Sequence, residues 1–259
     1  MNTLLDQGVL RSIKFTNGDE RRYWSGHEWQ LGTAAYWESA ADLTTNPPSY
    51  RLGTSLIEEL AACIIGGFGM TWDIVQPYLE RLRVDGVLDA GERPSPERVE
   101  ALLRNPVVVD GRARRYRFPR QRSMRLCAAF DYVSRLDTDA LEDRELRNAL
   151  SLSPGIGLKT ASWIVRNLRS SNAVAIIDIH VARAGVVAGV FDSRWHVARD
   201  YMLYEEAFLS WSHAGNVGAA KLDAVIWSAL SGKGSWSRQI LGTETFVGPL
   251  DPVWPAHAS

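Results

Sequence analysis

A chain of 259 residues, 46% hydrophobic and 23% charged, has the composition of a globular protein whose core fits one large domain or two lobes. No apolar run reaches the roughly 20 residues of a transmembrane helix, and the first residues lack the features of a secretory signal, so we expect a cytoplasmic protein. The 2 cysteines, Cys63 and Cys127, cannot form an iron–sulfur or four-cysteine zinc site, and a net charge of −1 argues only weakly against a nucleic-acid partner.

The first fifty residues differ from the rest of the chain. They are rich in aromatic side chains, carry few helix signals and end at the breaker Asn46-Pro47-Pro48. We expect residues 1–50 to form an irregular or partly β extension that packs on the main body.

From Thr54 onward the pattern is helical. Ser55 and Glu58 have the spacing of a capping box, which predicts a helix from this point to Ile65. Val107–Val109 fits a strand or an extended loop. No internal repeat or alternating strand–helix pattern is present, so we expect a mainly α-helical body. Further helices are predicted over 71–82, from Ser95 onward, and over 121–135, 138–150, 158–169, 179–189, 194–210 and 217–230.

The near-zero net charge hides a local bias. The segment Arg112–Arg125 contains seven arginines and no acidic residue, a pattern that suits phosphates and exposed bases. A solvated basic face balanced by the acidic stretch 141–145 explains the same residues equally well.

The most informative stretch is SPGIGLKTASWIVRNL, residues 153–168. Pro154-Gly155-Ile156-Gly157 reads as a tight turn between two helices, and its amides next to a helix N-terminus suit a phosphate. A plain helix–helix turn is the alternative. Lys159 follows in the first helical turn, where the positive end of the helix dipole favours loss of its proton, and partial burial would add to this. A neutral amine can attack C1′ of a deoxyribose.

Asp178 comes nineteen residues after that lysine, between an apolar run and the next helix. It is a natural N-cap, whose carboxylate is held ionised by backbone amides and can stabilise positive charge on the sugar. Taken singly, the lysine fits a solvated surface residue and the aspartate fits a simple cap.

SPGIGLKTA followed by AIIDIH resembles the helix-hairpin-helix DNA glycosylase superfamily, and the lysine and its spacing resemble the 8-oxoguanine glycosylase/AP lyase branch, especially its smaller prokaryotic enzymes. The resemblance implies a two-lobed helical fold with its core at 51–235, between irregular N- and C-terminal extensions, the latter at 236–259. It also implies that Lys159 is the Schiff-base nucleophile, Asp178 the catalytic carboxylate and His180 a phosphate contact.

Three looser matches extend this resemblance. Residues 221–234 are similar to the late helix beside the family's base pocket, which implies pocket roles for Asp223 and Trp227, with the bulky Trp163 nearby. Residues 58–75 resemble the segment whose tip fills the space left by the extruded base; Phe68 is the candidate wedge there and Met70 the reserve. Residues 116–126 resemble the segment that contacts the orphaned base, through Arg120 or Arg122.

The leading hypothesis is therefore a bifunctional glycosylase that excises 8-oxoguanine or another oxidised purine from double-stranded DNA and nicks the strand. It needs no metal or organic cofactor, although a monovalent cation fits at the hairpin, and it is expected to be a monomer associated with the nucleoid. Two alternatives stay open: a glycosylase for a different modified base, such as one in foreign DNA, and a non-catalytic hairpin protein that only binds DNA.

Overall fold

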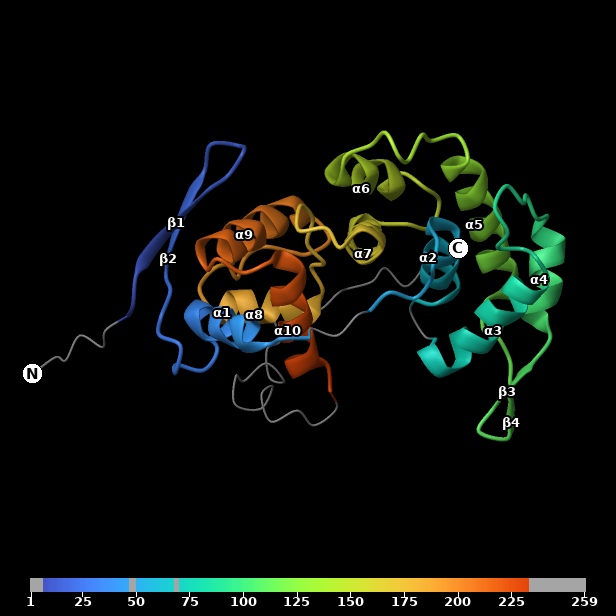
Figure 1. Cartoon of the computed structure of the whole chain (residues 1–259), viewed down its shortest axis with the longest axis horizontal. Helices are drawn as coiled ribbons and strands as arrows, with labels where there is room; N and C mark the ends of the chain where they lie inside the picture. The colour runs from blue at the N-terminus through green and yellow to red at the C-terminus, as the bar shows by residue number, and fades with distance from the viewer. Residues whose placement is uncertain (1–6, 47–49, 68–69, 233–259) are drawn as a thin grey trace, which may run out of the picture. The chain divides into compact units, whose positions relative to one another are not determined.

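The computed structural model describes residues 7–46, 50–67 and 70–232 (Figure 1). These residues form ten helices and two small antiparallel sheets, which confirms the mainly α-helical prediction. No helix among them is both long enough and apolar enough to span a bilayer. The predicted tail at 236–259 and the predicted boundary at residue 235 lie outside the described residues.

The described residues group into two compact units, and each is considered by itself below. We call Tyr50–Ser171 the hairpin unit, and we call the other, built from both ends of the chain, the split unit. The described part of the split unit consists of residues 7–46 and 172–232.

The hairpin unit contains six helices and one short sheet within its described residues. Ser55 caps its first helix by accepting a hydrogen bond from the amide of Glu58 at 3.2 Å, as predicted. The carboxylate of Glu58 accepts from Thr54 instead of closing a capping box with Ser55. Val107–Val109 is a strand. The elements are α2 (Leu56–Ile65), α3 (Trp72–Val84), α4 (Pro96–Arg104), β3 (Val107–Val109), β4 (Arg112–Arg114), α5 (Pro119–Val133), α6 (Asp143–Ser151) and α7 (Leu158–Arg169).

The split unit begins with a strand hairpin, in keeping with the partly β segment expected there, and with a helix that the sequence did not predict. Thr33 caps the helix through its side chain, and Trp37 is 1% exposed, so this segment contributes to the core of the split unit. The helix expected over 217–230 starts at Ala219, close to its predicted start, whereas the helix expected over 194–210 starts later, at Tyr201. The elements are β1 (Leu10–Lys14), β2 (Glu20–Trp24), α1 (Ala34–Leu43), α8 (Ile179–Val187), α9 (Tyr201–Ala214) and α10 (Ala219–Ser231).

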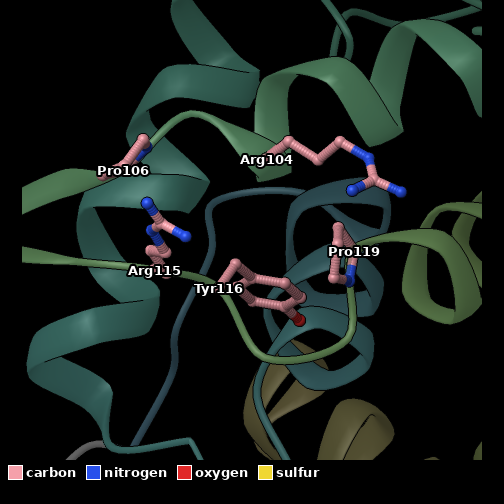
Figure 2. Close-up of a pocket in the computed structure, with 5 residues that line it drawn as sticks. All are labelled: Arg104, Pro106, Arg115, Tyr116 and Pro119. Carbon is pink, nitrogen blue, oxygen red and sulfur yellow. The ribbon is translucent and has the colours of Figure 1, made fainter.

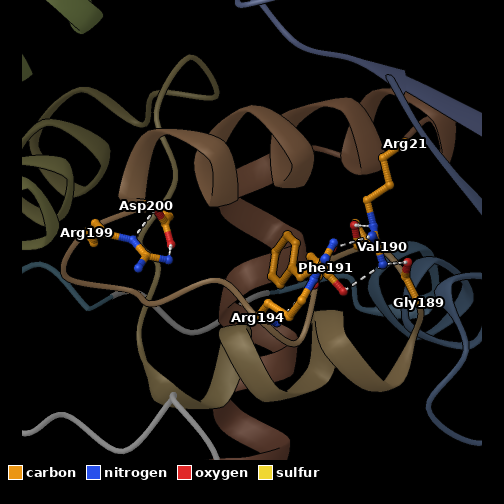
Figure 3. Close-up of polar contacts among 8 residues, drawn as sticks. Arg21, Gly189, Val190, Phe191, Arg194, Arg199 and Asp200 are labelled. Carbon is orange, nitrogen blue, oxygen red and sulfur yellow. Dashed lines mark hydrogen bonds and ion pairs between the residues drawn. The ribbon is translucent and has the colours of Figure 1, made fainter. Parts of the chain in front are cut away.

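Arg21 joins the N-terminal hairpin to the end of α8 (Figure 3). Its guanidinium donates to the carbonyls of Gly189, Val190 and Phe191 at 3.2, 3.0 and 3.0 Å and pairs with Asp192 at 3.3 Å. A guanidinium suits this position because it is positively charged and has several N–H groups that can donate to the carbonyls after a helix C-terminus. This contact fixes the C-terminal end of the helix that Asp178 caps at its N-terminus.

Candidate active site

The turn between α6 and α7 has the geometry expected of a phosphate-binding hairpin. Gly155 has φ +85°, a backbone conformation that favours glycine, and a Cβ there would make a tight contact of 3.0 Å with Cδ of Arg125. Ile156 is buried, whereas Gly155 and Gly157 are exposed. Gly157 is the N-cap of α7 and provides no capping side chain, and the first turn contains no acid. The free amides of α7 therefore suit an anion.

Lys159 lies in the first turn of α7 and is exposed. The partial burial expected from the sequence is therefore absent, and the amine is open to a substrate. Lys159 lies near Cys63 on α2. Burial raises the pKa of the Cys63 thiol and the Glu59 carboxylate raises it further, whereas the positive charge of Lys159 acts in the opposite direction.

Trp163, one helical turn after Lys159, is held by a buried carboxylate. Its indole Nε1 donates to Oε1 of Glu59 at 3.2 Å, and Glu59 is 0% exposed. The other carboxylate oxygen accepts from the amides of Leu52 and Gly53 at 3.0 and 2.7 Å. Burial raises the pKa of Glu59, while these hydrogen bonds act to lower it. Glu59 thus fixes the tryptophan ring on the helix that carries Lys159.

Replacing Trp163 by phenylalanine is expected to destabilise the protein by about 1–3 kcal/mol at pH 8, because the buried carboxylate loses a donor. Loss of that donor raises the pKa of Glu59 further. Glu59 therefore ionises at a higher pH in the folded protein than in the unfolded chain. The destabilisation caused by the substitution grows as pH rises, and it is smaller at pH 5 than at pH 8 because a larger fraction of Glu59 is protonated at the lower pH. Urea denaturation of both proteins at the two pH values measures this difference; an equal loss at both would contradict the assignment.

Asp178 is the N-cap of α8, as predicted from the sequence. One oxygen, Oδ1, accepts from the amides of His180 and Val181 at 2.9 and 2.8 Å. Among the described residues, no donor bonds the second oxygen, Oδ2. The cap therefore orients the carboxylate and leaves one oxygen for another partner. His180 lies half-buried in the first turn of the same helix.

Asp223 and Trp227 lie on α10, which packs against α8 within the split unit. Asp223 is buried and Trp227 is half-buried, and their spacing of four residues places both on one face of the helix. A half-buried indole retains surface that can stack on a base.

Arg122, on α5, lies beside Gly67, which belongs to the loop that the sequence predicted to enter the duplex. Its guanidinium is 3.5 Å from the position that a Cβ on Gly67 would occupy, and burial lowers its pKa. Its Nε is buried and has no hydrogen-bond partner among the described residues. Arg120 is exposed and Met70 is half-buried, whereas Phe68 lies outside the described residues.

The predicted site residues therefore form two groups, one in each unit. The hairpin unit brings together the turn, Lys159 and Trp163, and it also carries Met70, Arg120 and Arg122. The split unit carries Asp178, His180, Asp223 and Trp227. Sequence reasoning missed Glu59, whose only signal was its place as a second acid beside Glu58 in the first turn of α2. In the described part of the chain, no three His, Cys, Asp or Glu side chains gather as metal ligands.

Residues 106–217, which include the hairpin, Lys159 and Asp178, match the family model described as 8-oxoguanine DNA glycosylase. No match was found among curated protein sequences. Among solved structures, the 8-oxoguanine DNA glycosylase of Thermotoga maritima is 22% identical, with 70% of this chain and 81% of that chain covered and a TM-score of 0.49. That of Methanocaldococcus jannaschii is 23% identical, with 74% and 81% covered and a TM-score of 0.48.

A second structure from Methanocaldococcus jannaschii, an 8-oxoguanine glycosylase/lyase in complex with a 15mer DNA containing 8-oxoguanine, is 21% identical. It covers 76% of this chain and 87% of that chain with a TM-score of 0.50. The helical fold is similar to that of this last structure, a DNA glycosylase. Residues 106–217, which carry the hairpin, Lys159 and Asp178, are similar to the 8-oxoguanine DNA glycosylase family.

Proposed function

We propose that this protein is a bifunctional DNA glycosylase/AP lyase that extrudes and excises an oxidised purine, with 8-oxoguanine as the expected base. One observation carries the proposal: an exposed lysine stands in the first turn of α7, directly after the glycine turn, inside a segment that matches the 8-oxoguanine family. The Methanocaldococcus jannaschii glycosylase/lyase, which has a similar fold, was solved with DNA containing 8-oxoguanine.

In the proposed reaction, Nζ of Lys159 attacks C1′ of the extruded nucleotide as the bond from C1′ to the base breaks, and the base leaves with the bonding electrons and takes up a proton. Asp178 stabilises the positive charge that develops on the sugar through its second carboxylate oxygen, Oδ2. The resulting amine forms a Schiff base as the sugar ring opens. Loss of a proton from C2′ then expels the 3′ phosphate, which nicks the strand, and water releases the enzyme.

We propose that Trp163, Trp227 and Asp223 contact the extruded base, the tryptophans by stacking and the aspartate by accepting from its N–H groups. His180 and the amides of the hairpin would hold phosphates. The carbonyls of Gly155 and Ile156 accept no hydrogen bond within the described residues, so a monovalent cation fits there and would hold a phosphate without taking part in the chemistry. No organic cofactor is required. The protein would act as a monomer at the nucleoid.

The proposal is tested with duplex oligonucleotides that each contain a single modified base. Base release, strand nicking and borohydride trapping are measured for every duplex. We expect release of 8-oxoguanine, nicking at the same position and a trapped covalent complex. If no duplex of the panel gives a cross-link, the lyase mechanism is contradicted. If the base is released but the strand is not nicked, the protein is a glycosylase in which water attacks C1′ in place of the lysine.

A second candidate is a glycosylase of the same mechanism for a different modified base. It is favoured by the bulky Trp163, which Glu59 fixes on the helical face that carries Lys159. A fixed indole restricts the shape of the base that fits beside it. Trapping on another lesion of the same panel, with 8-oxoguanine left intact, would select this candidate.

A further inference from the structure

The hairpin unit carries a protruding basic ribbon formed by residues 107–115, which we call the arginine arm. Strands β3 and β4 pair antiparallel and extend away from the neighbouring helices (Figure 1). The connecting residues Asp110 and Gly111 have φ 51° and 70°, the conformation of a tight two-residue hairpin turn. All three residues of β4 are exposed.

The root of the arm is anchored. The hydroxyl of Tyr78 on α3 donates to the carbonyl of Arg114 at 3.0 Å. Arg81, also on α3, donates to the carbonyls of Leu102 and Pro106 at 2.8 and 2.9 Å, and its guanidinium lies 5.2 Å from the ring of Tyr78. The arm is therefore held in a defined direction at its base, and ordering it on a partner costs little entropy.

The arm presents unneutralised arginines. Arg112 and Arg114 pair with Val109 and Val107 across the ribbon, so both project from one face. Two residues apart on a strand, they stand about 7 Å from each other. The structure gives neither side chain, nor that of Arg115, a hydrogen-bond or ion-pair partner among the described residues. Although Asp110 lies at the tip of the arm, neither arginine forms an ion pair with it, and arginines without an ion-pair partner suit an external anion.

Arg115 also lines a cavity of about 220 Å³ where the arm meets α5 (Figure 2). Arg104 lines it too, held by Glu100 on its own helix, together with Pro106, Tyr116 and Pro119. Pro119 is the first residue of α5, whose N-cap has no side-chain hydrogen bond and whose first turn has no acid. The positive end of the helix therefore adds to the charge of Arg115 at this cavity.

Basic side chains connect this region with the hairpin along α5. Arg122 lies against Gly67, and three carbons of the Arg125 side chain lie within 3.4 Å of the position of a Cβ on Gly155 in the turn before α7. The arm thus continues a series of arginines along α5 that reaches the glycine turn before α7 inside a single unit.

We propose that the arginine arm binds the sugar–phosphate backbone of duplex DNA beyond the damaged nucleotide. The inference rests on the proposed function for the nature of the partner. A strand of DNA carries one charge per about 3.4 Å of helix axis, so Arg112 and Arg114 can meet different phosphates. Val108 is the arm's only exposed large hydrophobic side chain, which favours a polyanion over a protein partner that needs apolar anchors.

The test compares binding of undamaged duplex DNA by wild type and by a double variant, Arg112→Gln with Arg114→Gln, over a series of salt concentrations. We expect the variant to bind more weakly, with the slope of log affinity against log salt reduced by about 2, one for each lost phosphate contact. The matched control is Arg93→Gln with Arg135→Gln. It removes the same charge from exposed arginines that pair with Asp131 in the same unit, and its slope should stay at the wild-type value.

A second measurement locates the contact. When the duplex is shortened stepwise from one end, wild type should lose affinity at a length where the arm variant does not. Equal slopes for wild type and arm variant, or an equal reduction in the control, would overturn the proposal. Excision of 8-oxoguanine is assayed separately. If the wild-type protein binds DNA through the arm but excises no base, only the proposed function is contradicted. If excision is normal and the arm variant binds DNA as tightly as wild type, only the proposed role of the arm is contradicted.

Discussion

Replacing Lys159 by glutamine is expected to abolish borohydride trapping and strand nicking, and to slow base excision by roughly three orders of magnitude or more. The amide cannot form the bond to C1′ that the proposed mechanism requires. Because Lys159 is exposed, the substitution removes no core contact. It also removes a cation from the positive end of α7, so stability should stay the same or rise by about 0.5 kcal/mol.

The small number of lysines makes the result of this experiment easy to assign to one residue. The chain has only four lysines, Lys14, Lys159, Lys221 and Lys233, so few amines compete for the substrate. Lys14→Gln is the matched control, since Lys14 is exposed on β1. Mass spectrometry of the trapped wild-type complex should place the adduct on Lys159. An adduct on another amine, or full trapping by the Lys159→Gln variant, would show that the nucleophile lies elsewhere.

Local sequence signals predicted the elements that carry this chemistry. Ser55 and Asp178 form caps because a side-chain oxygen reaches amides two or three residues ahead, an interaction that lies within a short segment. The glycine turn before α7 is equally local, since glycine permits the positive φ that Gly155 adopts. Such features can be read without knowledge of the fold.

Features that depend on distant residues were not predictable in this way. Glu59 accepts a hydrogen bond from Trp163, which is 104 residues away in the sequence, and no pattern around either residue predicts this contact. The helix at Ala34–Leu43 is short, and its Trp37 and Glu38 become buried only because α1 packs with α10 and Trp211 donates to Glu38 at 2.9 Å. Lys159 was expected to be partly buried from its neighbours in the sequence, yet the structure leaves it exposed.

Replacing Asp178 by asparagine is expected to separate the structural role of this residue from its proposed chemical role. Asparagine caps helices about as well as aspartate, and its carbonyl oxygen can accept from the amides of His180 and Val181 as Oδ1 does. The variant should therefore lose at most about 1 kcal/mol of stability, from the weaker interaction with the helix dipole. It lacks the negative charge near the sugar, so excision should slow by about a hundredfold to a thousandfold.

Asp178→Ala provides the comparison, because it removes the cap as well as the charge. It should lose about 1 kcal/mol more stability than a variant that keeps the cap, with a similar loss of excision rate. The excision rate on a lesion duplex and the urea denaturation midpoint are measured for the three proteins. An asparagine variant that excises at the wild-type rate would reduce Asp178 to a cap alone. A variant that is stable and binds DNA but has lost excision would assign the remaining carboxylate oxygen to the reaction, since the cap occupies the other.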